Sequence, residues 1–106
     1  MGLFVFDTDF NIVKYFHSRN SELPNAYICD ILFDLTGKGW IGTMYSLAIY
    51  DPLTQTIQSR DFPEGFFDKE PNLTFNLCRN GDMLAVSETS VFRSKSDLSE
   101  YTTLDL

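Results

Sequence analysis

The 106-residue sequence is poor in the residue types that metal and thiol chemistry require. It has one histidine, His17, and two cysteines, Cys29 and Cys78, whose spacing is not typical of a zinc site. We expect both thiols to be buried structural groups, with a disulfide as the alternative if the protein is exported. No apolar run approaches the ~18 residues that a membrane-spanning helix needs. These absences disfavour a thiolate metal centre and a membrane helix.

Basic residues are also scarce. The chain has 8 Lys and Arg against 15 Asp and Glu, which gives a formal net charge of -7. Such a surface repels phosphate backbones and anionic lipid headgroups. We therefore expect no nucleic-acid partner and no membrane contact by this segment.

We expect no signal peptide in the first residues. Met1 and Gly2 are followed at once by the strand-like run Leu3–Phe6, without a basic region or a small-residue cleavage site. Either the protein is cytoplasmic or the chain is an internal piece of a larger exported protein. The second alternative is favoured, because the opening residues already resemble the middle of a repeat.

Aromatic residues are abundant, with ten Phe and five Tyr, and they favour strands. No stretch keeps apolar residues at helical spacing for three turns, although the loop segment 64–68 can hold one short helical turn. Turn signals separate short strand-like runs. The sequence therefore predicts an all-β protein with strands at 3–6, 12–16, 27–33, 40–43, 47–50, 56–60, 73–77, 83–87, 91–93 and 101–104.

The order of these runs repeats at an offset of about 44 residues. Gly37 and Gly81 are 44 residues apart, and Gly2–Asp7, Ser46–Asp51 and Ser90–Phe92 align at the same offset. A 40–50-residue repeat of four short strands is typical of a β-propeller blade. We predict about two and a half four-stranded antiparallel blades, near 1–26, 27–71 and 72–106. A small sandwich with accidental self-similarity is the alternative.

One motif predicts how the blades pack. Asp34 and Gly37 are typical of a tight turn between two strands. In the following strand, Trp40 and Gly42 face one side while Ile41 and Thr43 face the other. A large ring next to a position without a side chain lets a neighbouring sheet come close.

The stretch 20–43 resembles the two-component regulator propeller repeat, which has a polar Asn-Ser-Leu loop, an Ile-containing strand, Asp-x-x-Gly and Trp-Ile-Gly-Thr. Ser46–Asp51 and Gly2–Asp7 match its following Gly-Leu and Tyr-Asp segment, with Ser46 in place of Gly. Met83–Ser87 replaces Trp-Ile-Gly-Thr in the third copy. The resemblance implies part of the extracytoplasmic, periplasmic sensor half of a bacterial hybrid two-component histidine kinase. It also implies signal transduction in response to complex carbohydrate; the family's kinase and DNA-binding parts are not in these residues.

No residue cluster carries catalysis or metal binding. The segment Asp7–Asn11 alternates oxygen ligands as a Ca²⁺ loop does, but it lacks the Gly and Glu of an EF-hand, and strand-end turns explain Asp7, Asp9 and Asp51 better. His17 has no Ser-His-Asp or Cys-His spacing and is interpreted as a loop residue. We expect no enzyme activity, no catalytic residues, no cofactor and no metal.

Two groups of aromatic residues are candidates for contact with a sugar. Trp40, Phe33 and Tyr50 can form a stacking platform, although packing between blades is favoured for them. Three Phe in a polar loop are the exposed candidates, and they fit a neighbouring blade or a partner: Phe62, Phe66 and Phe67. The ligand-binding residues themselves remain unknown.

A propeller closes with four to eight blades, so two and a half blades leave sheet faces uncovered. We expect either a segment of a larger propeller or a self-associating unit. The leading functional hypothesis is a sensor segment that recognises a ligand, with oligosaccharide as the ligand class. The alternative is a protein-interaction or structural module without a small ligand.

Overall fold

A computed structural model of the chain describes residues 2–17, 19–23, 28–43, 46–60, 74–87 and 90–105. All regular structure in these ranges is β-strand. No helix long and apolar enough to cross a membrane is found in these ranges. The strands agree with the sequence prediction to within one residue at each end. They are β1 (Leu3–Phe6), β2 (Ile12–Phe16), β3 (Ile28–Phe33), β4 (Gly39–Thr43), β5 (Ser46–Asp51), β6 (Thr56–Arg60), β7 (Thr74–Leu77), β8 (Met83–Val86), β9 (Ser90–Ser94) and β10 (Tyr101–Asp105).

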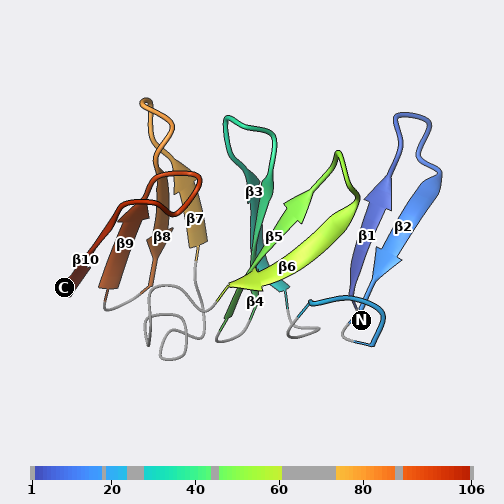
Figure 1. Cartoon of the computed structure of the whole chain (residues 1–106), viewed down its shortest axis with the longest axis horizontal. Coiled ribbons are helices and arrows are strands. Elements are labelled where there is room, and N and C mark those ends of the chain that lie inside the picture. Colours follow the sequence, from blue (N-terminus) through green and yellow to red (C-terminus); the bar gives the residue numbers. More distant parts are fainter. Residues whose placement is uncertain are drawn as a thin grey trace.

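The strands form three antiparallel sheets in chain order. The first sheet is β1-β2, the second is β3-β4-β5-β6, and the third is β7-β8-β9-β10. Figure 1 shows the three sheets side by side along the long axis of the molecule. The all-β prediction of about two and a half four-stranded blades is confirmed. A two-layer sandwich is wrong, because the second sheet packs other sheets against both of its faces.

The repeat seen in the sequence is also present in the turns. Gly37 and Gly81 both adopt the left-handed backbone, with φ of 88° and 93°, which glycine adopts without a steric cost. Their N–H groups donate to the carbonyls of Asp34 and Cys78, at 3.1 and 3.0 Å. The same turn thus joins β3 to β4 and β7 to β8. The predicted unit boundaries at 26/27 and 71/72, together with the short helical turn at 64–68, lie outside the described residues.

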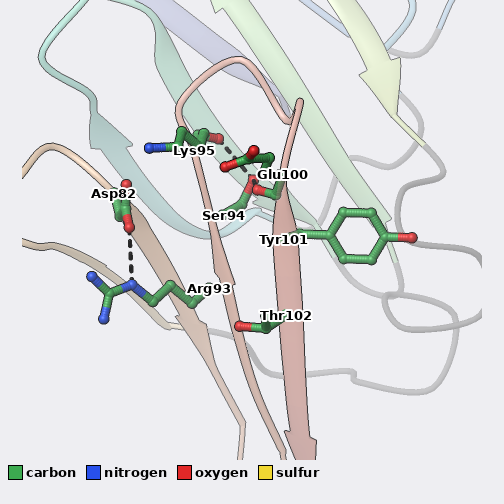
Figure 2. Close-up of a pocket in the computed structure, with 7 residues that line it drawn as sticks. All are labelled: Asp82, Arg93, Ser94, Lys95, Glu100, Tyr101 and Thr102. Atoms are coloured by element: carbon green, nitrogen blue, oxygen red, sulfur yellow. Dashed lines mark hydrogen bonds and ion pairs between the residues drawn. The ribbon is translucent and has the colours of Figure 1, made fainter.

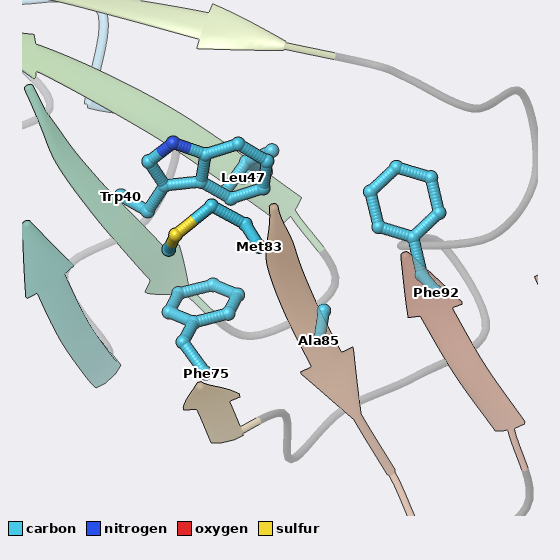
Figure 3. Packing of buried hydrophobic residues seen from close by; sticks show 6 residues of the cluster. All are labelled: Trp40, Leu47, Phe75, Met83, Ala85 and Phe92. Carbon is cyan, nitrogen blue, oxygen red and sulfur yellow. The ribbon is translucent and has the colours of Figure 1, made fainter. Parts of the chain in front are cut away.

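The second and third sheets meet through a buried apolar layer (Figure 3). The Trp40 ring meets the Phe75 ring edge-on, with 6.1 Å between centroids and an interplanar angle of 80°. A Cβ at Gly42 would lie 3.0 Å from Cζ of Phe75, so the missing side chain makes room for that ring. This confirms the packing role predicted for Trp40 and Gly42. The buried residues of the layer are Trp40, Leu47, Phe75, Met83, Ala85 and Phe92.

The opposite face of the second sheet packs on the first sheet. Phe16 at the end of β2 meets Tyr50 of β5 in a T-shaped contact, with 5.7 Å between ring centroids. Ile41, which faces away from Trp40 as strand alternation requires, is fully buried here. The buried residues of this second layer are Phe16, Leu23, Ile41, Ala48, Tyr50 and Ile57. As a result β4 is buried along its whole length.

A carboxylate ties the second sheet to the third. Asp30 Oδ2 accepts a hydrogen bond from the Phe75 backbone N–H at 2.7 Å, and Asp30 Oδ1 accepts one from the Ile31 N–H at 2.9 Å. Ile31 and Phe75 hold equivalent positions, 44 residues apart, in β3 and β7. The Asp30 side chain therefore accepts hydrogen bonds from two backbone amides that hold equivalent positions in successive blades.

Candidate functional site

Asp34 organises the turn between β3 and β4. Its Oδ1 accepts hydrogen bonds from the Thr36 and Lys38 backbone N–H groups at 2.9 and 3.1 Å. Its Oδ2 accepts the indole N–H of Trp40 at 3.1 Å, in a buried position. The motif from Asp34 to Trp40 is thus a single hydrogen-bonded unit that positions the packing ring.

The other acidic residues at strand ends also serve turns. Asp7 Oδ1 accepts the backbone N–H groups of Asp9 and Asn11, both at 2.9 Å, and the hydrogen bond from Asn11 is the main cause that lowers the pKa of Asp7. Asp51 Oδ1 accepts the Leu53 N–H at 2.9 Å. In the part of the chain that the structure describes, no group of three or more His, Cys, Asp or Glu is placed to hold a metal ion. The turn interpretation of Asp7, Asp9 and Asp51 fits these contacts.

A polar pocket of about 230 Å³ lies on the third sheet, between the ends of β8, β9 and β10 (Figure 2). At its edge Arg93 Nε donates to Asp82 Oδ2 at 3.0 Å. This hydrogen bond holds the pKa of Asp82 below its usual value, and Lys95 acts in the same direction. The lining residues are Asp82, Arg93, Ser94, Lys95, Glu100, Tyr101 and Thr102. The pocket therefore offers both signs of charge and several hydroxyl groups.

The aromatic ring at this pocket does not form a platform over it. Figure 2 shows the Tyr101 ring on the opposite side of β10 from Thr102 and Arg93, and its centroid lies 5.8 Å from that of Phe92. A second hollow of about 210 Å³ adjoins the pocket and shares Asp82 and Lys95 with it. Hydrogen bonding and ion pairing, rather than stacking, are the interactions that this surface can make.

An apolar cavity of about 250 Å³ lies at the other end of the chain, between β1 and the second sheet. Its walls come from β1, β3, β4 and β5, and its lining residues are Leu3, Phe4, Val5, Phe6, Ile31, Phe33, Gly39, Ile41 and Tyr50. No charged side chain contributes to this lining. The cavity suits an apolar occupant.

The structure separates the three aromatic residues that the sequence grouped as a sugar platform. Trp40 and Tyr50 are buried in different layers, on opposite faces of the second sheet, which confirms the packing interpretation for them. Phe33 is 51% exposed and lines the apolar cavity. Phe62, Phe66 and Phe67 lie outside the described residues.

His17 follows β2 as a loop residue, as predicted. Its backbone N–H donates to Asn20 Oδ1 at 2.8 Å, and its Nδ1 accepts the Arg19 N–H at 3.1 Å. These bonds shape the loop after β2. Neither Cys29 nor Cys78 forms a disulfide bond, and both are half-buried, so the expectation that they are buried is wrong.

Sequence reasoning did not single out the polar pocket. Its signal is present in the repeat, because Arg93 occupies the position that Ile49 holds 44 residues earlier. An apolar packing position has become a cation in the third sheet. A search for polar residues at apolar repeat positions would have found it.

No protein-family model matches the sequence, and no curated protein matches it. Solved structures do match it, and the first is the extracellular domain of BT3049 from B. thetaiotaomicron, assigned as a hybrid two component system. It has 21% sequence identity and a TM-score of 0.77 over 98% of this chain. The chain has the fold found in this extracellular domain. The resemblance seen in the sequence is thereby confirmed at the level of the fold.

A second protein of B. thetaiotaomicron shares the fold. The extracellular domain of BT4673, assigned as a one component system in one structure and as a hybrid two component system in another, has 16% identity to this chain in both. The TM-scores are 0.74 and 0.75, over 99% of this chain. The chain spans only 14% to 15% of the length of these matched structures.

Proposed function

We propose that the chain is a non-catalytic segment of an extracytoplasmic sensor domain in a two-component system, where it packs with other blades of a larger propeller. The observation that carries this proposal is the agreement of the whole stack of three sheets with the extracellular domain of BT3049, at a TM-score of 0.77. The acidic surface, with a net charge of -7, fits a role that needs no contact with nucleic acid.

The ligand that we propose is an oligosaccharide. The polar pocket supports it, because sugar hydroxyl groups both donate and accept hydrogen bonds. Asp82 and Glu100 can accept such bonds, whereas Arg93 and Lys95 can donate them. Arg93 is the residue to substitute in a test of this pocket. Half of its side chain is exposed (49%), whereas its partner Asp82 is more buried (16%).

A thermal-shift screen of the chain with a panel of neutral and acidic oligosaccharides tests the ligand class. A binding sugar should raise the Tm as its concentration rises, because it binds only the folded state. Arg93→Ala should remove this shift. Arg60→Ala is the matched control, because Arg60 lies on β6 and does not line the polar pocket. If no oligosaccharide raises the Tm, or if both variants lose the shift equally, the proposed ligand or its site is wrong.

A protein-interaction module without a small ligand is the second candidate. The exposed apolar side chains beside the apolar cavity favour it, namely Phe4, Phe6, Ile31 and Phe33. The absence of any sugar-induced shift, together with a defined protein complex that forms through these residues, would favour this candidate over the first.

A further inference from the structure

The polar pocket on the third sheet has a counterpart on the second sheet. A hollow of about 360 Å³ there is lined by Lys38, Ile49, Asp51, Thr54, Thr56, Gln58 and Arg60. Five of these residues stand 44 positions before residues that line the polar pocket, namely Asp82, Arg93, Lys95, Glu100 and Thr102. The same place is therefore hollow in two successive blades.

The counterpart shows what happens to this place when a sheet packs beside it. Ile49, in the wall of the counterpart, also packs against the buried layer between the second and third sheets. The third sheet thus packs on this face of the second sheet, and the hollow beside Ile49 remains open. We expect a further blade that packs on the third sheet in the same way to leave the polar pocket open as well.

The polar pocket continues toward the turns of the stack. The adjoining hollow of about 210 Å³, the turn hollow, is lined by Leu35, Asn80, Gly81, Asp82, Lys95, Ser96 and Asp97. Leu35 belongs to the turn between β3 and β4, and a Cβ at Gly81 would lie 3.0 Å from its Cδ1. The turns of the second and third sheets therefore meet at the turn hollow.

Asp82 and Lys95 line both spaces and mark their junction. Figure 2 shows these two residues near the turn that precedes β10, with Arg93 and Thr102 further along the strands. In the part of the chain that the structure describes, the ion pair recorded joins Asp82 to Arg93 and does not involve Lys95. The Lys95 ammonium is thus available to a ligand at the junction.

The size of the two spaces favours a ligand that enters both. The polar pocket has about 230 Å³ and the turn hollow about 210 Å³. Each is smaller than the roughly 300–1,000 Å³ of a typical small-molecule site. A ligand that crosses the junction beside Lys95 gains contacts in both spaces.

The charges of the two spaces disfavour an anion. Two cations, Arg93 and Lys95, stand against three carboxylates, Asp82, Asp97 and Glu100. Arg93 is already paired with Asp82, and the whole chain has a net charge of -7. A ligand carboxylate beside Lys95 would therefore meet the like charges of Asp97 and Glu100.

We propose that the polar pocket and the turn hollow form one groove that binds a neutral oligosaccharide of at least two sugar units, with Lys95 in contact with both units. This inference rests on the proposed function, in which the ligand is an oligosaccharide. Sugar hydroxyl groups accept hydrogen bonds from Lys95 and donate them to Asp97 and Glu100. The exposed Leu35 methyl groups offer an apolar contact for the C–H face of the second unit.

Isothermal titration calorimetry of the whole 106-residue chain tests the length and the charge of the ligand. The probes are a panel of mono-, di- and trisaccharides in which each neutral hexose sugar has its hexuronate counterpart. A neutral disaccharide should bind roughly tenfold or more tightly than its monosaccharide, because it reaches the second space. Its hexuronate counterpart should bind more weakly.

Three variants of the chain make the test specific. Lys95→Met keeps the length of the side chain, removes its charge and should remove most of the gain of the disaccharide over the monosaccharide. Lys38→Met is the matched control, because Lys38 lines the counterpart on the second sheet and neither space of the groove. Asp97→Asn should strengthen binding of the acidic disaccharide several-fold and leave the neutral one unchanged. Circular dichroism checks that all three are folded.

The groove is wrong if monosaccharide and disaccharide bind equally, if Lys95→Met and Lys38→Met behave alike, or if the acidic disaccharide binds as tightly as the neutral one. Disaccharide binding that Arg93→Ala removes and Lys95→Met leaves intact would overturn the groove and keep the proposed ligand class. No binding by any member of the panel would overturn both.

Discussion

At the scale of single residues, Asp34 explains why its motif has the form it has. A carboxylate with two oxygens can hold a turn with one and a buried indole N–H with the other. The turn and the packing ring are thus positioned together. In the third sheet Cys78 stands in place of Asp34 and Leu84 in place of Trp40, so the ring and its acceptor are absent as a pair.

Asp34→Ala should lower the free energy of unfolding by about 1–3 kcal/mol, because the buried indole N–H of Trp40 loses its acceptor. Urea unfolding followed by circular dichroism measures this change in every variant. Asp51→Ala is the control, since Asp51 accepts an exposed turn bond from the Leu53 N–H and its loss should cost clearly less. The interpretation is wrong if Asp34→Ala costs the same in a Trp40→Phe background as in the wild type.

Gly42 is the residue that allows the second and third sheets to approach. Gly42→Ala should cost about 1–3 kcal/mol, because its Cβ would lie 3.0 Å from Cζ and 3.1 Å from Cε2 of Phe75. Thermal unfolding gives the difference. In a Phe75→Leu background the same substitution should cost less, since the ring atoms that it meets are gone. An equal cost in both backgrounds would refute the steric account.

The ion pair at the polar pocket predicts a pH dependence. The hydrogen bond from Arg93 lowers the pKa of Asp82 in the folded state below its ordinary value of 3.8. The unfolded chain therefore binds more protons in this range, and the stabilisation is present above pH 3.8 and is lost as the pH falls through the folded pKa. The Tm of the wild type and the Tm of Asp82→Asn, each measured as a function of pH, should converge in this acidic window. A difference in Tm that stays constant from pH 6 to pH 2 would contradict the prediction.

At the scale of strands and turns, local signals determine most of what is observed. Alternation of apolar and polar residues, together with Gly37 and Gly81 at positions of positive φ, predicts the strands to within one residue. The contact of β3 with β7 could not be predicted in this way, because no turn or repeat signal in the sequence distinguishes Asp30 from other polar strand residues. Its partner is 45 residues away in the sequence and is a backbone amide.

Asp30→Ala should weaken the attachment of β7 to β3. Hydrogen exchange measured by NMR should show the Phe75 amide exchanging faster, because its acceptor at 2.7 Å is removed. The amides of β5 should keep their protection, since their partners belong to the second sheet itself. Unchanged protection of Phe75 would mean that this bond does not hold the strand.

At the scale of the whole molecule, the sheets form a linear stack in which the second sheet shares a buried layer with each neighbour. The stack resembles a short repeat array, in which stability is the sum of each unit and its interfaces. Within the described residues the first sheet has two strands where the others have four, so we expect the fewest interactions to hold it.

Native-state hydrogen exchange should therefore show the amides of β1 and β2 opening first. We expect their exchange to be roughly tenfold or more faster than that of β4 and β5, because local opening removes one interface only. Uniform protection across the three sheets would show that the stack unfolds as a single cooperative unit.

The sequence by itself determined the strands, their turns and the 44-residue repeat, because these depend on interactions between residues close together in the chain or on a pattern repeated along it. It also determined which face of β4 carries Trp40 and Gly42. The tertiary structure alone decided that Arg93 lies beside Asp82 at a pocket and that Asp30 binds the Phe75 amide. These features depend on the way successive sheets pack, which local patterns do not encode.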